Sequence, residues 1–294
     1  MRHIEFINAD HFEKNYHRHF VKGRLSLFID FFWQTKFETL WVQYPDNFSD
    51  ALFPNLGYTF IINLGTPFDM QVDQNRKPVK SDIILPRLHH IECYHHPGNI
   101  LFGIKFKVSP VLFEKKVNFS EYNGSVYPLS YLAEPSLLEK IKQAASFEKR
   151  IELLSAYYEE KLKQYESSLR PVSIVTQLLD KAVKQNRFNT SLELLAAMQH
   201  ISPRTLHRYF LACTGVNAKQ ALQVLRIRTA VNHILSNPET FRIDQYGYYD
   251  YSHFYKHLKQ FLSNRAIQEI KPHLQVLNSL KKDKAGKNTG PLST

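Results

Sequence analysis

The sequence predicts an α+β protein of more than one domain. We expect an N-terminal β-barrel with helices, then an all-α domain in which two similar helical units are joined by a long helix. Three observations support this prediction. Strand-like segments fill residues 1–132, one helical pattern occurs twice within residues 191–263, and positive charge is concentrated in that second part. With 294 residues the chain is long enough for two hydrophobic cores.

Segments with the composition of β-strands lie in the first part of the chain. They are rich in β-branched and aromatic residues, and Pro, Gly or Asn stands between them. The segments are residues 38–44, 58–64, 70–72, 82–85 and 100–108. Several short strands at this spacing are typical of a barrel or a sandwich.

Residues 135–165 predict a pair of helices. The apolar residues recur at a spacing of three or four and form two faces. The first face is Leu137, Leu138, Ile141, Ala144 and Ala145, and the second is Ile151, Leu154, Tyr158, Leu162 and Tyr165. The pair could cover an open side of the barrel or form a dimer interface. Residues 164–173 contain Ser-Ser and Arg-Pro and are the best candidate for an interdomain linker, and residues 173–186 then predict a helix.

Two segments of the C-terminal part share a pattern at a constant offset of 48 residues. The first is Ile201-Ser202-Pro203 with Leu206, Phe210 and Cys213, and the second is Tyr249-Asp250-Tyr251 with Phe254, Leu258 and Phe261. Ser202 and Asp250 are helix N-cap residues, and the apolar residue before each cap has the spacing of a hydrophobic staple. Residues at i, i+4 and i+7 bury one side of a helix and leave the other side free.

A short predicted helix, residues 191–198, precedes the first of these segments by a three-residue turn. Two helices joined in this way form a helix-turn-helix, whose second helix enters the DNA major groove. The motifs resemble the AraC/XylS family of bacterial transcription regulators. They are Ser-Pro-Arg-Thr-Leu-His-Arg-Tyr-Phe (202–210), Thr-Gly-Val (214–216), Arg226 with Ala230, and Gly-Tyr-Tyr-Asp-Tyr-Ser-His-Phe (247–254).

This resemblance implies two helix-turn-helix units joined by one long helix. Residues 218–235 suit the joining helix, because apolar residues recur there at helical spacing and Pro238 follows its end. The second unit departs from the family pattern, since Ser263 replaces the usual Gly, Arg265-Ala266 replace Thr-Pro, and Ile243 stands where a small residue is usual. We therefore expect the second unit to be held less rigidly.

The charge distribution agrees with a DNA-binding C-terminal part. The net charge is +1 for residues 1–170, +7 for residues 171–275 and +3 for residues 276–294. A basic domain attracts phosphates and gains affinity from the release of counterions. We predict a regulatory part at residues 1–165, a DNA-binding domain at 166–275 and a basic, disordered tail at 276–294.

The resemblance implies sequence-specific binding of double-stranded DNA and regulation of transcription. The predicted DNA-binding residues occupy the free faces of the two repeated helices: Ser202, Arg204, Thr205, His207, Arg208, Ser252, His253, Tyr255, Lys256 and Lys259. Residues 52–65 and 102–106 resemble the cupin-like N-terminal domain of some such regulators, which senses an effector, forms dimers, or both. Candidate partners are thus a small-molecule effector, whose binding residues stay unknown, a second copy of the chain through the N-terminal part, and RNA polymerase.

The alternative is a metal-dependent cupin-type enzyme with a basic helical appendage. His89-His90 and His95-His96 flank residues 91–94, and alternation along a strand would let His89 and His95 share a face. Zinc or iron needs three or four converging ligands, so these histidines could equally belong to a polar turn. A site at His11, His17 and His19 is a further, weaker candidate. We predict no catalytic residue, metal or cofactor.

The remaining features predict a cytoplasmic protein. The N-terminus lacks the apolar run of a signal peptide, and no stretch reaches 18 uninterrupted apolar residues. Cys93 and Cys213 are the only cysteines, which does not resemble a disulfide framework or a Cys-rich zinc site. The sequence also lacks a Gly-rich phosphate loop and a nucleophile elbow.

Overall fold

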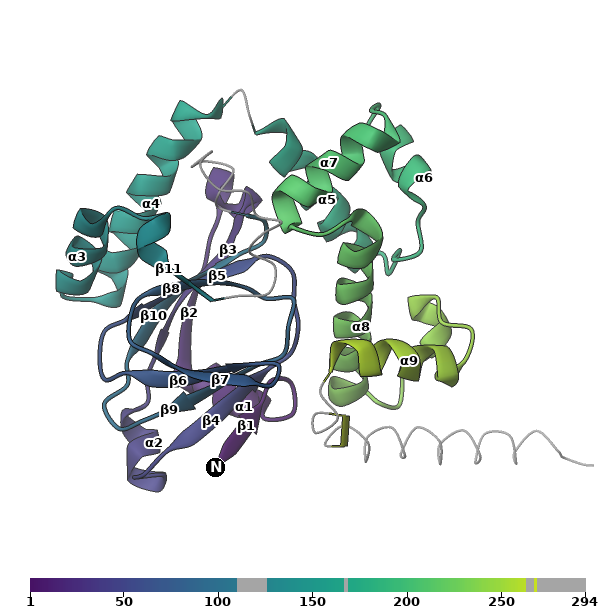
Figure 1. Cartoon of the computed structure of the whole chain (residues 1–294). Helices are drawn as coiled ribbons and strands as arrows, with labels where there is room; N and C mark the ends of the chain where they lie inside the picture. The colour runs from purple at the N-terminus through teal and green to yellow at the C-terminus, as the bar shows by residue number, and fades with distance from the viewer. Residues whose placement is uncertain (110–125, 167–168, 263–266, 269–294) are drawn as a thin grey trace, which may run out of the picture.

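The computed structural model describes residues 1–109, 126–166, 169–262 and 267–268. Two β-sheets form the N-terminal part, and helices form the C-terminal part beside them (Figure 1). The predicted tail, 276–294, lies outside the described residues. Within the described ranges, no helix has the length and apolar character needed to cross a membrane.

The strands form a five-stranded sheet, β1-β4-β9-β6-β7, and a six-stranded sheet, β11-β8-β5-β10-β3-β2. Only β1 and β4 pair in parallel among the described strand pairs. The strands are β1 (Arg2–Ile4), β2 (Tyr16–Phe20), β3 (Ile29–Thr35), β4 (Phe48–Leu52), β5 (Tyr58–Asn63), β6 (Phe68–Val72), β7 (Asn75–Val79), β8 (Ile83–Pro86), β9 (Ile91–His95), β10 (Leu101–Phe106) and β11 (Tyr127–Pro128).

The predicted barrel is not closed. Among the described residues no strand pair joins the two sheets, so each sheet keeps its own edges. The sequence could not settle this point, because alternating strands look alike in a barrel and in a sandwich. Four of the five predicted strands are confirmed as β5, β6, β8 and β10.

The central strands of the larger sheet, β5, β8 and β10, are buried on both faces, which explains their continuous apolar runs. Side chains alternate along a strand. Ile61 and Leu101 therefore face the smaller sheet, whereas Phe60, Ile62 and Ile104 face the helices. Every residue of β10 is buried.

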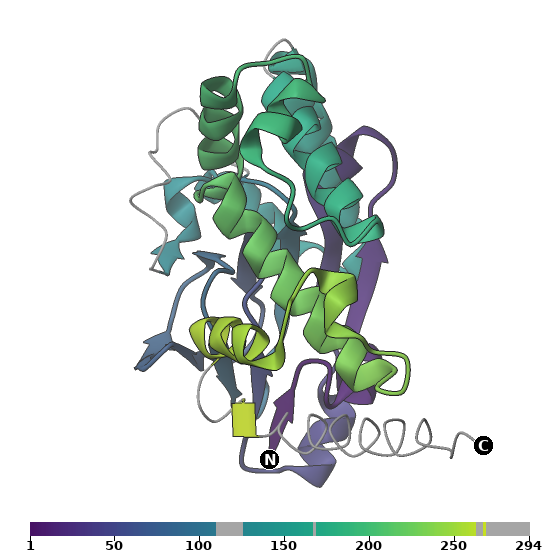
Figure 2. The ribbon, with the colours of Figure 1, turned by 90° about the vertical axis from the view of Figure 1, so that its right-hand side faces the viewer.

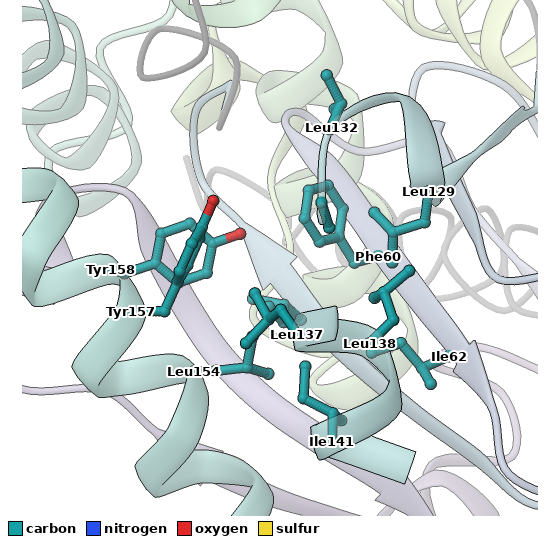
Figure 3. Close-up of a pocket in the computed structure, with 12 residues that line it drawn as sticks. Phe60, Ile62, Leu129, Leu132, Leu137, Leu138, Ile141, Leu154, Tyr157 and Tyr158 are labelled. Atoms are coloured by element: carbon teal, nitrogen blue, oxygen red, sulfur yellow. The ribbon is translucent and has the colours of Figure 1, made fainter. Parts of the chain in front are cut away.

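The predicted helical pair is confirmed as α3 (Pro135–Gln143) and α4 (Phe147–Gln164). Leu138, Ile141, Leu154 and Tyr158 point toward Phe60 and its neighbours on the larger sheet (Figure 3). Only a cavity of about 20 Å³ remains between them. The pair thus covers one face of the sheet, and a dimer interface at the pair stays a prediction.

The strand predicted at residues 38–44 is wrong, because this segment is helix α2 (Glu38–Gln43). Phe37, Leu40, Trp41 and Tyr44 recur at intervals of three and four, and all pack with Phe48. Val42 lies between them and is 84% exposed. The β-type composition was misleading here because the helical spacing of the aromatic residues decides which face can be buried.

The remaining short helices of the N-terminal part connect strands, except for the last, which joins β11 to α3. They are α1 (Ala9–Asn15), η1 (Gly23–Leu27) and η4 (Leu129–Tyr131). The C-terminal part contains α5 (Arg170–Lys184), α6 (Leu192–Ala197), α7 (Pro203–Thr214), α8 (Ala218–Ser236), η6 (Ile243–Tyr246) and α9 (Tyr251–Phe261). Helix α8 runs from α7 at one end to α9 at the other, and the side view shows the same arrangement (Figures 1 and 2).

Both cysteine thiols are buried, and burial raises the pKa of Cys93 and of Cys213 to about 12. The thiolate is the reactive form of cysteine. At pH 8 we therefore expect iodoacetamide to alkylate the folded protein about 1,000-fold more slowly than the unfolded chain. Mass spectrometry over time, with and without denaturant, measures both rates. Equal rates in the two conditions would contradict the buried placement of the thiols.

Candidate functional site

The first repeated segment forms α7 as the sequence predicts. Ser202 Oγ accepts a hydrogen bond from the Thr205 amide over 3.1 Å, which confirms Ser202 as the N-cap. Leu206, Phe210 and Cys213 are fully buried. A polar face is consequently left on the outside of the helix.

Helix α7 ends on a glycine in the left-handed conformation. Gly215 has φ 73°, and its amide donates to the carbonyl of Leu211 over 2.9 Å. Glycine adopts this conformation without steric cost, so the end of the helix is well defined. Asn217 then caps α8 through a hydrogen bond from the Gln220 amide.

The outer face of α7 carries the predicted DNA-binding residues. Ser202, Arg204, His207 and Arg208 are exposed, and Thr205 is half-buried beside the cap. Among the described residues, neither Arg204 nor Arg208 makes an ion pair or a side-chain hydrogen bond. Both guanidinium groups are therefore available to an external acceptor.

The second repeated segment forms α9 with one correction. Asp250 Oδ1 accepts from the His253 amide over 2.7 Å, and Phe254 and Leu258 are buried, as predicted. The side chain of Phe261 lies outside the described residues. Tyr249 is 93% exposed, so it is not a hydrophobic staple. Tyr248 is buried instead, and its ring lies 5.2 Å from that of Phe254.

Fewer of the predicted site residues of α9 than of α7 are fully exposed to solvent. Ser252, Lys256 and Lys259 are exposed, whereas His253 and Tyr255 are half-buried. Tyr255 packs against the core, and the His253 ring contacts those of Tyr248 and His257. Lysines thus supply the free cations of this helix.

The segment before α9 is shorter than a helix-turn-helix requires. Residues Ile243–Tyr246 form one 3-10 turn and no α-helix, which corrects the expected second unit. The Tyr248 amide donates back to the Ile243 carbonyl, so the chain turns there at once. Ile243 is buried, and α9 leaves through an extended Leu262 without a left-handed cap. Ser263, Arg265 and Ala266 lie outside the described residues.

Arg226 of α8 joins the surrounding segments. It is 4% exposed; its guanidinium donates to Asn189 Oδ1 over 2.9 Å and to the Gly247 carbonyl, and lies 3.6 Å from the Tyr248 ring centre. Burial lowers the pKa of Arg226, opposed by Tyr248. Gly247 has φ 70°, and a Cβ there would lie 2.3 Å from the Asn189 amide nitrogen. Arg226 therefore fixes the turn that precedes α9.

A cavity of about 80 Å³ lies between the two sheets. Its walls are largely apolar and include Trp33, Ile61, Met70 and Leu101. Arg18, Arg87, Lys105 and Glu5 also line it. Lys105 donates to the carbonyls of Leu56 and Phe106, and burial lowers its pKa well below the usual value.

One wall of this cavity reaches the C-terminal helices through Glu5. Its carboxylate accepts from Arg228 of α8 over 2.5 Å and lies 4.0 Å from Arg87. Burial raises the pKa of Glu5, but Arg228 outweighs it with the help of Arg87 and the Phe53 amide, and the result is a lowered pKa. Glu5 is therefore charged at neutral pH and docks the N-terminal part onto α8.

The structure does not bring His89 and His95 together. His89 Nδ1 lies 2.8 Å from Asp73 Oδ2 near the surface, whereas His95 is fully buried beside Asp50 and Asn99. The interpretation of His95 as part of a polar turn is wrong, because residues 91–95 are strand β9. His17 and His19 lie on β2, apart from His11 on α1.

No family model matches the chain, and no curated protein matches it either. Among solved structures, the chain is similar to ToxT from Vibrio cholerae in its P21 form, with a TM-score of 0.39 and 13% identity over 74% of this chain and 95% of that one. ToxT from strain O395 gives 0.40 and 12% over 74% and 92%, and unsaturated fatty acid bound ToxT from strain SCE256 gives 0.38 and 11% over 74% and 90%. A likeness this distant does not establish a family.

Arg226→Met should loosen the turn before α9. It leaves Asn189 and the Gly247 carbonyl without their donor and removes the contact with Tyr248, so we expect local opening of α9 to become easier by about 2–4 kcal/mol. Native-state hydrogen exchange of the amides of residues 247–258 measures this change. The matched control is Arg208→Ala, an exposed arginine whose loss should change the same amides by less than about 0.5 kcal/mol. Equal effects of the two substitutions would contradict the role of Arg226.

Proposed function

We propose that the protein is a sequence-specific double-stranded-DNA-binding transcription regulator of AraC type. The exposed face of α7 carries this proposal. Arg204 and Arg208 stand free on a helix with a fixed start and end, and an arginine can donate two parallel hydrogen bonds to one guanine. We infer a regulator and not an enzyme because the exposed face of α7 presents hydrogen-bond donors to an external acceptor.

The position of α9 supports two contacts with one DNA duplex. Helix α8 has 19 residues and is about 28 Å long. This length is close to one turn of DNA, about 34 Å, which is the separation of two successive major-groove contacts on one side of a duplex. We propose Ser252, His253, Tyr255, Lys256 and Lys259 for the second contact.

In this proposal α7 and α9 have different roles in DNA binding. Arginine on α7 specifies bases, whereas Lys256 and Lys259 on α9 hold phosphates, which positions the protein without selecting a sequence. Exposed lysines with single ammonium groups suit this task. Helix α9 packs mainly on α8, whereas α7 packs on α5, α6 and α8.

We propose residues 1–165 as the regulatory part and residues 166–275 as the DNA-binding domain. The cavity between the sheets is the candidate effector site. Its apolar walls and its cations Arg18 and Arg87 suit a small amphipathic anion, and neither Arg87 Nε nor Thr59 Oγ1 has a hydrogen-bond partner among the described residues. Dimerisation through the N-terminal part and contact with RNA polymerase belong to the same proposal.

Single substitutions on the two helices should have different effects on DNA recognition. Arg204→Ala or Arg208→Ala should abolish about 1–3 kcal/mol of preference at particular base pairs, whereas Lys256→Ala and Lys259→Ala should weaken binding to all sequences alike. The measurement is the base-preference profile of each variant on a site selected from random DNA. If the lysine variants lose preference at defined positions while the arginine variants weaken uniformly, the assignment is wrong.

An amphipathic anion should bind in the cavity between the sheets. We expect hexanoate, but not hexanol, to change the fluorescence of Trp33, which lines the cavity. Arg87→Met should weaken hexanoate binding about tenfold or more, because the charge that pairs with the carboxylate is lost. Arg76→Met is the control, since Arg76 pairs with Asp69 at the surface. Equal binding of the acid and the alcohol would refute an anion site.

A further inference from the structure

A cluster of histidines surrounds one buried carboxylate, and one of them, His95, also lines the cavity between the sheets. Asp50 is fully buried, and His3, His11 and His95 are each at most 8% exposed. The residues come from different elements. His3 pairs with Asp50 across β1 and β4, His11 projects from α1, and His95 ends β9.

The ring nitrogens converge on the carboxylate of Asp50. His3 Nδ1 lies 3.2 Å and His11 Nε2 2.9 Å from Oδ1, and His95 Nε2 lies 3.4 Å from Oδ2. Two ligands of one tetrahedral zinc ion, each about 2.0–2.1 Å from the metal, are roughly 3.3 Å apart. The observed separations from the carboxylate therefore have the size that a shared ion requires.

Two of these nitrogens face the carboxylate without hydrogen-bonding to it. Among the described residues, His11 Nε2 and His95 Nε2 have no hydrogen-bond partner. The His95 ring is oriented from its other side, because its Nδ1 lies 2.8 Å from Asn99 Oδ1 and the Asn99 amide donates to the Thr66 carbonyl. A metal-ligating histidine is commonly fixed in this way through its second nitrogen.

The carboxylate at the centre of the cluster is fully buried. His3 Nδ1 is within hydrogen-bonding distance of Oδ1, at 3.2 Å. Tyr16 also donates to Oδ2 over 2.5 Å. A buried carboxylate needs a compensating cation.

We propose that His3, His11 and Asp50 form a binding site for a divalent transition-metal ion of the Zn²⁺ type, with His95 beside it. Ligand atoms of these three residues lie within 4.8 Å of one another. Two imidazoles and one carboxylate suit zinc and its neighbours, whereas Mg²⁺ and Ca²⁺ prefer oxygen ligands alone. A surface hollow lined by His3, His11 and Asn15 gives the ion an entry path.

Loading of this site displaces protons and turns one ring. The His3 and His11 rings are stacked, with centres 3.6 Å apart and planes 7° from parallel, so one ring rotates before both lone pairs meet an ion. The Asn15 amide lies 3.2 Å from His11 Nδ1, which places a proton on Nε2 in the ion-free protein. Metal binding accordingly releases that proton to solvent.

The bound ion would fasten the first 16 residues to the smaller sheet. His3 and His11 bracket Glu5, whose carboxylate docks Arg228 of α8. The site is structural in this role, and its test does not depend on the proposals on DNA and effector binding, although His95 also lines the cavity between the sheets. It also requires neither His89 nor the surface histidines of β2.

The test is equilibrium binding of Zn²⁺ to the full chain in the presence of nitrilotriacetate, which suppresses weak sites on the other histidines. We expect one Zn²⁺ per chain, no binding of Mg²⁺, and proton release seen as a dependence of the binding heat on the buffer. His11→Gln and Asp50→Asn should weaken Zn²⁺ binding about 100-fold or more, since each removes a ligand. The control, His89→Gln, should bind as the parent does.

Less than one tightly held Zn²⁺ per parent chain overturns the proposal, and so does unchanged binding by a folded His11→Gln variant. If Asp50→Asn does not fold, the parent stoichiometry and the His11→Gln comparison still decide. A Co²⁺ complex of the parent with an octahedral spectrum of water-type ligands would equally overturn it, because nitrogen ligands in a closed site give intense tetrahedral absorption. DNA binding is not a readout here.

Discussion

The buried guanidinium of Arg226 determines how the C-terminal helices meet. A charged group with 4% exposure is tolerated only when polar partners surround it, and its donors reach an amide oxygen, a main-chain carbonyl and the face of a tyrosine ring. These partners belong to two separate segments, at Asn189 and at Gly247–Tyr248. Both segments therefore meet at α8, and the turn that precedes α9 takes its place from this one residue.

The helices of the C-terminal part could be predicted from the sequence because their caps and apolar stripes depend only on residues a few positions apart. An N-cap side chain bonds an amide three residues away, and an apolar stripe depends only on helical spacing, so Ser202 and Asp250 could be assigned without any knowledge of the fold. The hydrophobic staple predicted for the second segment is wrong by one residue. Gly247 reverses the chain in a left-handed conformation and buries Tyr248 in place of Tyr249, and the constant offset of 48 residues could not show this shift.

The candidate sites of the N-terminal part depend on contacts between distant residues, which no spacing rule captures. His3, Asp50 and His95 meet because β1, β4 and β9 are adjacent in one sheet, and strand order is not written in the alternation of side chains. The same holds for α2, where aromatic residues of strand-like composition follow a helical spacing dictated by the packing of Phe37 and Leu40. Short β-segments are therefore located by sequence more reliably than they are ordered.

Helix α8 contacts two different parts of the molecule through arginines that are only two positions apart. Successive residues in an α-helix are separated by about 100°, so Arg226 and Arg228 point about 200° apart. Arg226 faces the turn that holds α9, whereas Arg228 faces Glu5 and the Phe6 ring of the N-terminal part. Glu5 also lines the cavity between the sheets and lies near Arg87. If the proposed anionic effector bound in the cavity, it would compete with Glu5 for Arg87, and Glu5 is also the partner of Arg228. The helix that lies between α7 and α9 is thus linked to the cavity through Glu5.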